Sequence, residues 1–197
     1  MAIDSYMAFK PYGLDWLLAE SQVDLSNNKE ELASMSPKPG AGALFEVEEY
    51  SFDVEQTLNI GSQSSGSGAG KIVFNPFSIT RPIDKASPTF FKMACNGTAF
   101  QNVVLMLRKS LGAGAGADNT SGGVFLRFDF KLVAVKTISW AHDETSPKET
   151  MTFEYGGLQM RYTQQDPSGK LGPVRAAGWN RVRNVSDDDA NAKIDKV

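Results

Sequence analysis

The sequence predicts a mainly β protein, a barrel or a sandwich of antiparallel strands with one short helix. About seven segments alternate between apolar and polar residues, which is the period of a half-buried strand. Glycine-rich runs separate several of these segments, and in three of them the apolar positions change parity once, as a β-bulge produces. Because bulges supply the corners of a curved sheet, they favour a barrel over a sandwich.

The N-terminal part predicts a first strand, a long loop and a second strand. The strand over residues 6–9 ends at the turn signal of residues 10–13. Residues 21–42 are polar and rich in Pro, Gly and Ser toward their end, so we expect a long loop with one helical turn near residues 29–33. From residue 44 to residue 60 the alternation returns, and its parity changes at Glu48-Glu49, which predicts a bulge there.

Residues 61–70, GSQSSGSGAG, predict the flexible tip of a long hairpin. The next strand covers residues 72–83 and is interrupted beside Pro76, because proline cannot donate to a central sheet ladder. After the helix, residues 103–107 are apolar at every position, so we expect both faces of that strand to be covered.

A helix of two to three turns is expected over residues 88–96. Ser87 is placed to cap it, Pro88 suits the first helical position, and Gly97 suits the left-handed residue that follows a helix. A helix this short is marginal alone in water, so its aromatic residues must dock it. We expect Phe90 and Phe91 to do so, with Cys95 buried on the same side.

The second half of the chain predicts a regular strand, a turn and a bent strand. After the glycine-rich residues 112–123, four apolar residues point one way and Arg127, Asp129 and Lys131 point the other. The chain turns at residues 142–148, and the parity of residues 151–162 changes across Gly156-Gly157. A last strand over residues 178–185 closes a single domain, 1–185, and we expect residues 186–197 to form a disordered tail.

Composition and charge exclude several classes of protein. Twenty Lys and Arg stand against 23 Asp and Glu, for a net charge of −3, and the basic residues form no cluster, so nucleic-acid binding is not expected. No run of about 18 apolar residues could cross a membrane. The N-terminus lacks the pattern of a signal peptide, and the single cysteine excludes an internal disulfide.

No catalytic or cofactor motif is complete. Gly70-Lys71 lacks the earlier glycine and the following hydroxyl of a phosphate loop, since Ser65 and Ile72 stand there. One histidine, His142, cannot supply a two-histidine metal site or pair with a buried Cys95. The acidic run 187–189 lacks the ligand spacing of a calcium loop. We therefore expect no enzyme activity, metal or cofactor.

Several motifs in order resemble the haemolysin-coregulated protein (Hcp) family, the inner-tube proteins of bacterial type VI secretion. They are GAGKI, ITRPIDKASPTFFKMACNG, LMLRK, FLRFDFKLVAVKTISW and GPVRAAGWNRVRNV, which together cover about residues 51–185. The IDKASP element and the Gly178-Trp179-Asn180 ending are the most specific. Residues 21–42 depart from the family pattern, which has a short connection there.

The resemblance implies a β-barrel of two antiparallel sheets with the helix packed alongside. It also implies hexameric rings that stack into a tube, contact the spike and sheath of the secretion system, and carry small effector proteins in the lumen. Family members reside in the bacterial cytoplasm before firing and are then delivered outside without a signal peptide.

Three groups of residues are candidates for these contacts. The hairpin implied to reach a neighbouring subunit or ring contains Leu58, Ile60, Gly61, Gly66, Gly68, Gly70 and Lys71. Polar strand residues that divide between ring interface and lumen are Arg127, Asp129, Lys131, Thr137 and Ser139. A second ring face would use Gly112, Gly114, Asp118, Trp179 and Arg183.

Two other functions compete with the tube protein. A secreted, monomeric β-sandwich that binds a ligand such as a carbohydrate predicts exposed aromatic residues in one cluster of loops. A hydrolytic effector on the same scaffold would need a further catalytic domain, for which the residues after Trp179 leave little room. The mass in solution separates a ring from the monomeric module.

Overall fold

The computed structural model describes residues 3–23, 42–58, 69–109, 124–142, 146–165 and 171–187. The elements are β1 (Ile3–Pro11), β2 (Phe45–Glu46), β3 (Glu49–Ser51), β4 (Val54–Leu58), β5 (Ala69–Phe74), β6 (Phe77–Pro82), α2 (Ser87–Asn96), β7 (Ala99–Lys109), β8 (Val124–His142), β9 (Pro147–Gln165), β10 (Leu171–Asn180) and β11 (Val185–Ser186). The chain is thus mainly β with one helix in its described part, as the sequence predicts.

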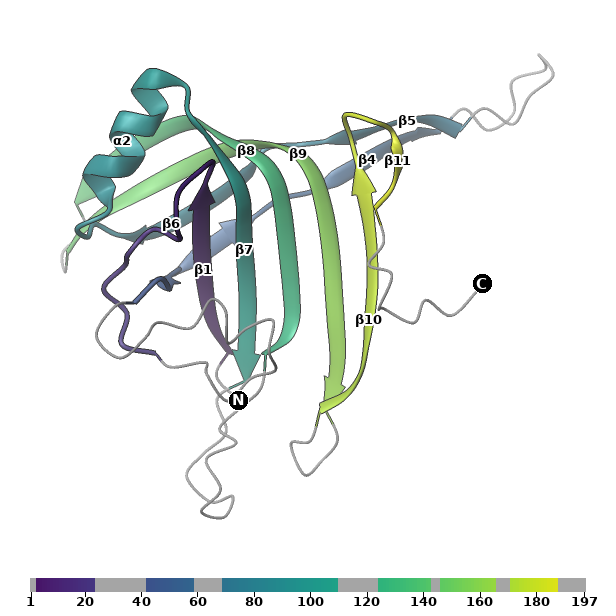
Figure 1. Cartoon of the computed structure of the whole chain (residues 1–197), viewed down its shortest axis with the longest axis horizontal. Helices are drawn as coiled ribbons and strands as arrows, with labels where there is room; N and C mark the ends of the chain where they lie inside the picture. The colour runs from purple at the N-terminus through teal and green to yellow at the C-terminus, as the bar shows by residue number, and fades with distance from the viewer. Residues whose placement is uncertain are drawn as a thin grey trace.

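Antiparallel pairing joins most strands into one curved sheet, in the order β11-β10-β9-β8-β7-β1-β2 (Figure 1). A second layer branches from it, because the first half of β9 also pairs with β6, which in turn pairs with β3. β4 and β5 pair only with each other among the described strands. In Figure 1 this hairpin extends away from the body of the molecule.

The strands that the structure describes do not close into a regular barrel, which corrects that part of the expectation. Residues 45–51 join the two layers by changing partner: β2 pairs with β1, and β3 pairs with β6. At the change, the Val47 amide donates to the Ser5 carbonyl and the Glu48 amide donates to the Thr80 carbonyl. The bulge predicted at Glu48-Glu49 therefore lies where the chain passes from one layer to the other.

The two 19-residue strands, β8 and β9, are long enough to take part in both layers. Their ladder has a register shift between Val135 and Thr137, and Leu132 adopts φ 51, a left-handed conformation that is unusual for leucine. A Cβ on Gly156 would lie 3.0 Å from Leu132 Cδ2, so glycine leaves room for this irregular turn of the strand. The change of parity across Gly156-Gly157 marks the same bend.

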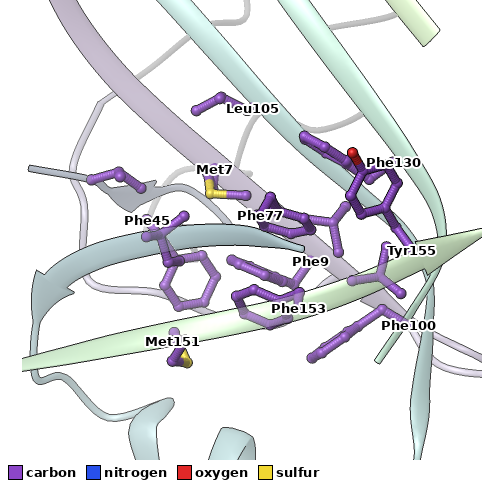
Figure 2. Close-up of a cluster of buried hydrophobic side chains, with 14 of the residues drawn as sticks. Met7, Phe9, Phe45, Phe77, Phe100, Leu105, Phe130, Met151, Phe153 and Tyr155 are labelled. Carbon is purple, nitrogen blue, oxygen red and sulfur yellow. The ribbon is translucent and has the colours of Figure 1, made fainter. Parts of the chain in front are cut away.

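The main core lies between the two layers and is rich in phenylalanine (Figure 2). Phe77 stacks on Phe130 and Phe153, with ring centroids 4.3 and 4.7 Å apart. Phe9 contacts Phe90 of the helix edge-on at 4.8 Å. These buried rings hold β1, β6, β8, β9 and α2 together, since each buried aromatic side chain contributes a large apolar area.

A smaller apolar cluster covers the opposite face of β1 and β7. It contains Tyr6, Ala8, Leu44, Val104, Met106 and Val124, with Trp16 and Val23 packed against it. Residues 103–107 are all buried, which confirms that both faces of this strand are covered.

The helix ends as predicted but begins differently. Gly97 has φ 69 and its amide donates to the Met93 carbonyl, and Pro88 lies in the first turn. Ser87 is the first helical residue, not the cap, because its hydroxyl is engaged elsewhere. Phe90 and Met93 form the buried stripe, whereas Phe91 and Cys95 are exposed, so the prediction that these two are buried is wrong.

Candidate assembly surfaces

A fully buried ion pair fixes the helix to the sheet. Arg81 and Glu149 face each other across the β6–β9 ladder, and their side chains are 2% and 0% exposed, with Nη2 and Oε1 2.6 Å apart. The guanidinium carbon of Arg81 lies 4.9 Å from the Phe45 ring and 5.0 Å from the Phe90 ring. Because the charges lie against aromatic rings and are almost fully buried, this pair is part of the framework of the fold.

Neighbouring polar groups add hydrogen bonds to this pair, although Arg81 Nε is buried without a hydrogen-bond partner among the described residues. The Ser87 hydroxyl donates to Glu149 Oε1 at 2.9 Å, and Trp140 Nε1 donates to Glu149 Oε2 at 3.3 Å. Asp84 Oδ2 lies 3.0 Å from Arg81 Nη1, so Asp84 pairs with Arg81 and not with its neighbour Lys85. The IDKASP element is thus a structural clamp that joins the start of α2 to β6 and β9.

A cavity of about 190 Å³ opens beside this clamp. It is lined by Glu20, Ser21, Leu44, Phe45, Glu46, Arg81, Pro82, Ile83 and Asp84. Pockets that bury small-molecule ligands usually exceed about 300 Å³, so this space suits one side chain rather than a substrate.

The polar face of β8 carries a ladder of charges. Arg127 donates to Asp129 through Nε at 3.0 Å and Nη2 at 2.5 Å, and Arg161 of β9 approaches the other Asp129 oxygen at 3.6 Å. Lys131 Nζ lies 2.8 Å from Asp187 Oδ2. The structure therefore brings three of the five predicted strand residues together on one face.

Thr137 and Ser139 lie beyond the bend and do not belong to this ladder. Both are exposed, and they face Thr152 and Thr150 of β9. The exposed rings of Phe91 and Trp140 are 6.0 Å apart nearby, across α2 and the end of β8. The five residues therefore occupy two separate surfaces, and their roles in an assembly stay predictions.

The hairpin β4–β5 contains part of the first candidate group. Leu58 pairs with Ala69 at the outer end of its described ladder, and Gly70 and Lys71 belong to β5. Ile60, Gly61, Gly66 and Gly68 lie outside the described residues. At its base, Phe74 is buried against Tyr155, but Val54 and Val73 are 47% and 42% exposed.

Of the second ring-face candidates, Trp179 and Arg183 are described, and Gly112, Gly114 and Asp118 lie outside the described residues. Trp179 is partly buried against the main core, and its Nε1 has no hydrogen-bond partner. Arg183 is exposed in the turn between β10 and β11. The structure does not bring these two into one patch with the polar ladder of β8.

A contact that sequence reasoning missed lies after β10, where the chain returns over Gly178. The Asp187 amide donates to the Gly178 carbonyl at 2.9 Å, and Gln159 Nε2 donates to the Asp187 carbonyl at 3.3 Å. A Cβ on Gly178 would lie 2.5 Å from that carbonyl oxygen. Ser186 and Asp187, which we expected in the disordered tail, are thus held on the sheet. The one sequence signal for this contact was Gly178, because glycine allows another chain segment to approach closely.

Nothing in the described ranges resembles a catalytic or metal centre. No group of three or more His, Cys, Asp or Glu residues there could hold a metal ion. His142 ends β8 and Cys95 is exposed on α2. Burial raises the pKa of Tyr155 to about 12. In the same part of the chain, helices are too short or too polar to span a bilayer.

Comparison with known proteins gives one family and one fold. The family described as "Type VI secretion system effector, Hcp" matches residues 36–162. A solved type six secretion system protein is 22% identical, with a TM-score of 0.72 over 94% of this chain and 100% of its own. Hcp1 from Salmonella typhimurium is 20% identical, with a TM-score of 0.63 over 94% and 99%.

A more distant structure, the secreted protein Hcp3 from Pseudomonas aeruginosa, is 14% identical with a TM-score of 0.54 over 98% of this chain and 100% of its own. No match was found among curated proteins. At these identities the solved structures establish a shared fold, which covers nearly the whole chain.

Proposed function

Because the chain belongs to the Hcp family of type VI secretion tube proteins, we propose that six copies form a ring and that rings stack into a tube. We propose that it acts as a structural protein and not as an enzyme, which membership of this family supports. The proposal has three parts: the chain forms a hexamer, the hexameric rings stack, and the ring lumen carries small effector proteins.

One observation carries the proposal: among the described residues the β4–β5 hairpin pairs with no other strand, and it packs on the main core at its base, through Ile72 and Phe74. A two-stranded sheet is at best marginally stable alone in water. Here it also exposes Val54 and Val73. A neighbouring copy that covers this hairpin would supply further packing, and contacts between unlike patches of identical subunits build rings.

Exposed apolar residues elsewhere support the same assembly. Met160 and Tyr162 of β9 are 45% and 42% exposed on the face that continues the core. Exposed aromatic residues such as Tyr50, Phe91, Trp140 and Tyr162 lie on strands and on α2, not in one cluster of loops as a carbohydrate-binding monomer predicts. Surfaces of this kind mark contacts between proteins.

The proposed partners follow from this role. They are other copies of the chain, the spike and sheath of the secretion system, and small effectors held in the ring. The proposed location is the bacterial cytoplasm before firing and the outside of the cell afterwards.

Negative-stain electron microscopy of the purified chain tests the proposal. We expect rings with sixfold symmetry, and end-on stacks of rings at higher protein concentration. Particles of a single copy at every concentration and salt would contradict the ring and support the monomeric binding module.

A further inference from the structure

Two aromatic side chains, the aromatic patch, are exposed side by side where α2 meets the end of β8. Phe91 of α2 is 52% exposed and Trp140 of β8 is 53% exposed, and their ring centroids lie 6.0 Å apart. Ile138, two residues before Trp140 on the same face of the strand, packs against the main core. The aromatic patch therefore continues the apolar core to the surface, where about half of each residue remains open to solvent.

The indole of Trp140 is held in place although it is exposed. Its Nε1 donates to Glu149 Oε2 at 3.3 Å, and Glu149 is fully buried and paired with Arg81 at 2.6 Å. The Ser87 hydroxyl donates to the other oxygen of the same carboxylate at 2.9 Å. A side chain that is already ordered loses little conformational entropy when a partner binds. The buried clamp thus pre-organises a tryptophan, one of the residue types that dominate binding energies between proteins.

The exposed side of α2 extends this apolar surface. Pro88, Phe91 and Cys95 are exposed at spacings of three and four residues, so they lie along one side of the helix. Lys92 is exposed beside them. A segment of another protein that lies along α2 would therefore contact this stripe and the ring of Trp140 together.

The charged groups around the aromatic patch are basic. Residues 85–96 carry Lys85 and Lys92 and no carboxylate, and both lysines are exposed. The carboxylate that precedes them, Asp84, is already paired with Arg81. Residues 136–142, at the end of β8, contain no carboxylate either. This rim therefore favours a partner with carboxylates over one with basic side chains.

The aromatic patch lies apart from the surface that carries the proposed ring contact. In Figure 1, α2 is at the upper left, whereas β10 and the β4–β5 hairpin are at the right. Two copies that met through their aromatic patches would also bring Lys85 and Lys92 of one copy against the same lysines of the other. Like charges placed opposite each other disfavour such a symmetric contact.

We propose that the aromatic patch is a docking surface for a protein other than a second copy of this chain, and that this partner presents apolar side chains flanked by carboxylates. An apolar centre with a charged rim is the usual anatomy of a contact between proteins. The aromatic rings supply the affinity, and the lysines select an acidic partner. The inference goes beyond the proposed function, because it holds whether or not the copies form rings.

Fluorine NMR of the full chain labelled with 5-fluorotryptophan tests the docking. The chain has three tryptophans, and the variants Trp16→Phe and Trp179→Phe assign their signals. The probe is a short helical peptide of leucines flanked by glutamates, and a second peptide has lysines in place of the glutamates. We expect the acidic peptide to shift the Trp140 signal but not the Trp179 signal, and to bind at least about tenfold more tightly than the basic peptide.

Two variants locate the contact. Phe91→Ser removes one exposed ring, so we expect the acidic peptide to bind at least about tenfold more weakly. Lys85→Glu with Lys92→Glu reverses the rim, so we expect this variant to prefer the basic peptide. The matched control is Val182→Ser, which removes an apolar side chain that is 70% exposed in the turn after β10, and its peptide affinity should equal that of the wild type. Thermal unfolding of each variant shows a loss of folding separately.

The outcomes separate this inference from the proposed function. An unshifted Trp140 signal up to about 1 mM acidic peptide, or equal affinities for the two peptides, would overturn the docking surface. Native mass spectrometry that shows folded Phe91→Ser without the rings of the wild type would also overturn it, because the patch would then join copies of this chain. If the wild-type chain forms no ring but the acidic peptide still shifts the Trp140 signal, the proposed function fails and the docking surface stands.

Discussion

Two clusters of charge in this molecule use the same chemistry in opposite surroundings. Arg81 and Glu149 are enclosed by aromatic rings beneath α2, and their side chains are at most 2% exposed. Lys131 and Asp187 also form a short ion pair, on the polar face of the sheet, but their side chains are 43% and 36% exposed. The first cluster is therefore part of the subunit interior, and the second remains accessible to solvent.

The largest expected effect comes from breaking the buried cluster. Arg81→Met leaves the Glu149 carboxylate buried without its cation, so we expect the free energy of unfolding to fall by about 3–5 kcal/mol. Urea unfolding measures this loss. The double variant Arg81→Met with Glu149→Leu should recover much of it, because it also removes the unpaired charge. If Arg81→Met lowered the free energy of unfolding by less than about 1 kcal/mol, the buried ion pair would matter no more than an exposed one, and the contrast between the two clusters would be wrong.

Tyr155 tests how strongly burial acts on a titratable group that has no ion pair of its own; burial is the largest cause of its raised pKa, and the charge of Asp53 adds to it. Burial raises the pKa of its hydroxyl to about 12 from the ordinary value of 10.0. The folded state therefore holds this proton more tightly than the unfolded state, so stability is full below pH 10 and is lost as the pH rises toward 12. The loss should approach about 2–3 kcal/mol at the upper end.

The matched variant for this prediction is Tyr155→Phe. The hydroxyl has no hydrogen-bond partner, so its removal should cost little or even stabilise the fold near neutral pH. Unfolding curves between pH 9 and pH 12 should lose part of their slope in the variant. An unchanged slope would show that the phenol of Tyr155 is not the group that titrates.

Gly178→Ala tests the chain return beside the exposed cluster. A Cβ there would lie 2.5 Å from the Asp187 carbonyl oxygen, so residues 185–187 must move away from β10. We expect a loss of about 1–3 kcal/mol, as for other overpacked positions. Hydrogen exchange at the Asp187 amide should rise as well, whereas Gly172→Ala on the same strand, with its nearest contact at 3.3 Å, should change it little.

The smallest effect is expected from the exposed pair itself. A double-mutant cycle with Lys131→Ala and Asp187→Ala should give a coupling of about 0.2–1 kcal/mol, because both side chains are partly solvated. The coupling should weaken further in 1 M salt, where charges are screened within about 3 Å. A coupling as large as that of the buried pair would show that solvent exposure does not separate the two clusters.

The sequence predicted the strands and the helix better than it predicted which side chains contact each other across them. The alternation of residues 126–130 and the signals at Pro88 and Gly97 depend on local geometry, so these predictions agree with the structure. Leu132, which the same alternation places on the buried face, is 47% exposed, so the prediction is wrong at that residue. The pairing of Arg81 with Glu149 joins positions 68 residues apart, and no local pattern announces it. Cys95 was misplaced because the buried stripe of α2 follows Phe90 and Met93, three residues apart.

For the candidate assembly surfaces, too, local sequence patterns predict which residues share a face but not how distant parts of the chain are arranged. The polar face of Arg127, Asp129 and Lys131 follows from strand period alone. The separation of Thr137 and Ser139 from it depends on the bend at Leu132, whose φ of 51 no residue pattern predicts for leucine. Periodicity indicated the mainly β fold class, whereas the family and the proposed role of the chain came from the resemblance.

The central claim is that the exposed strands of this subunit are covered by copies of itself. The most direct test is the native mass of the purified chain at micromolar concentration. The account predicts about 128 kDa, which is six times the 21.4 kDa of one chain. A single species of 21.4 kDa from micromolar to millimolar concentration, at low and at moderate salt, would contradict it.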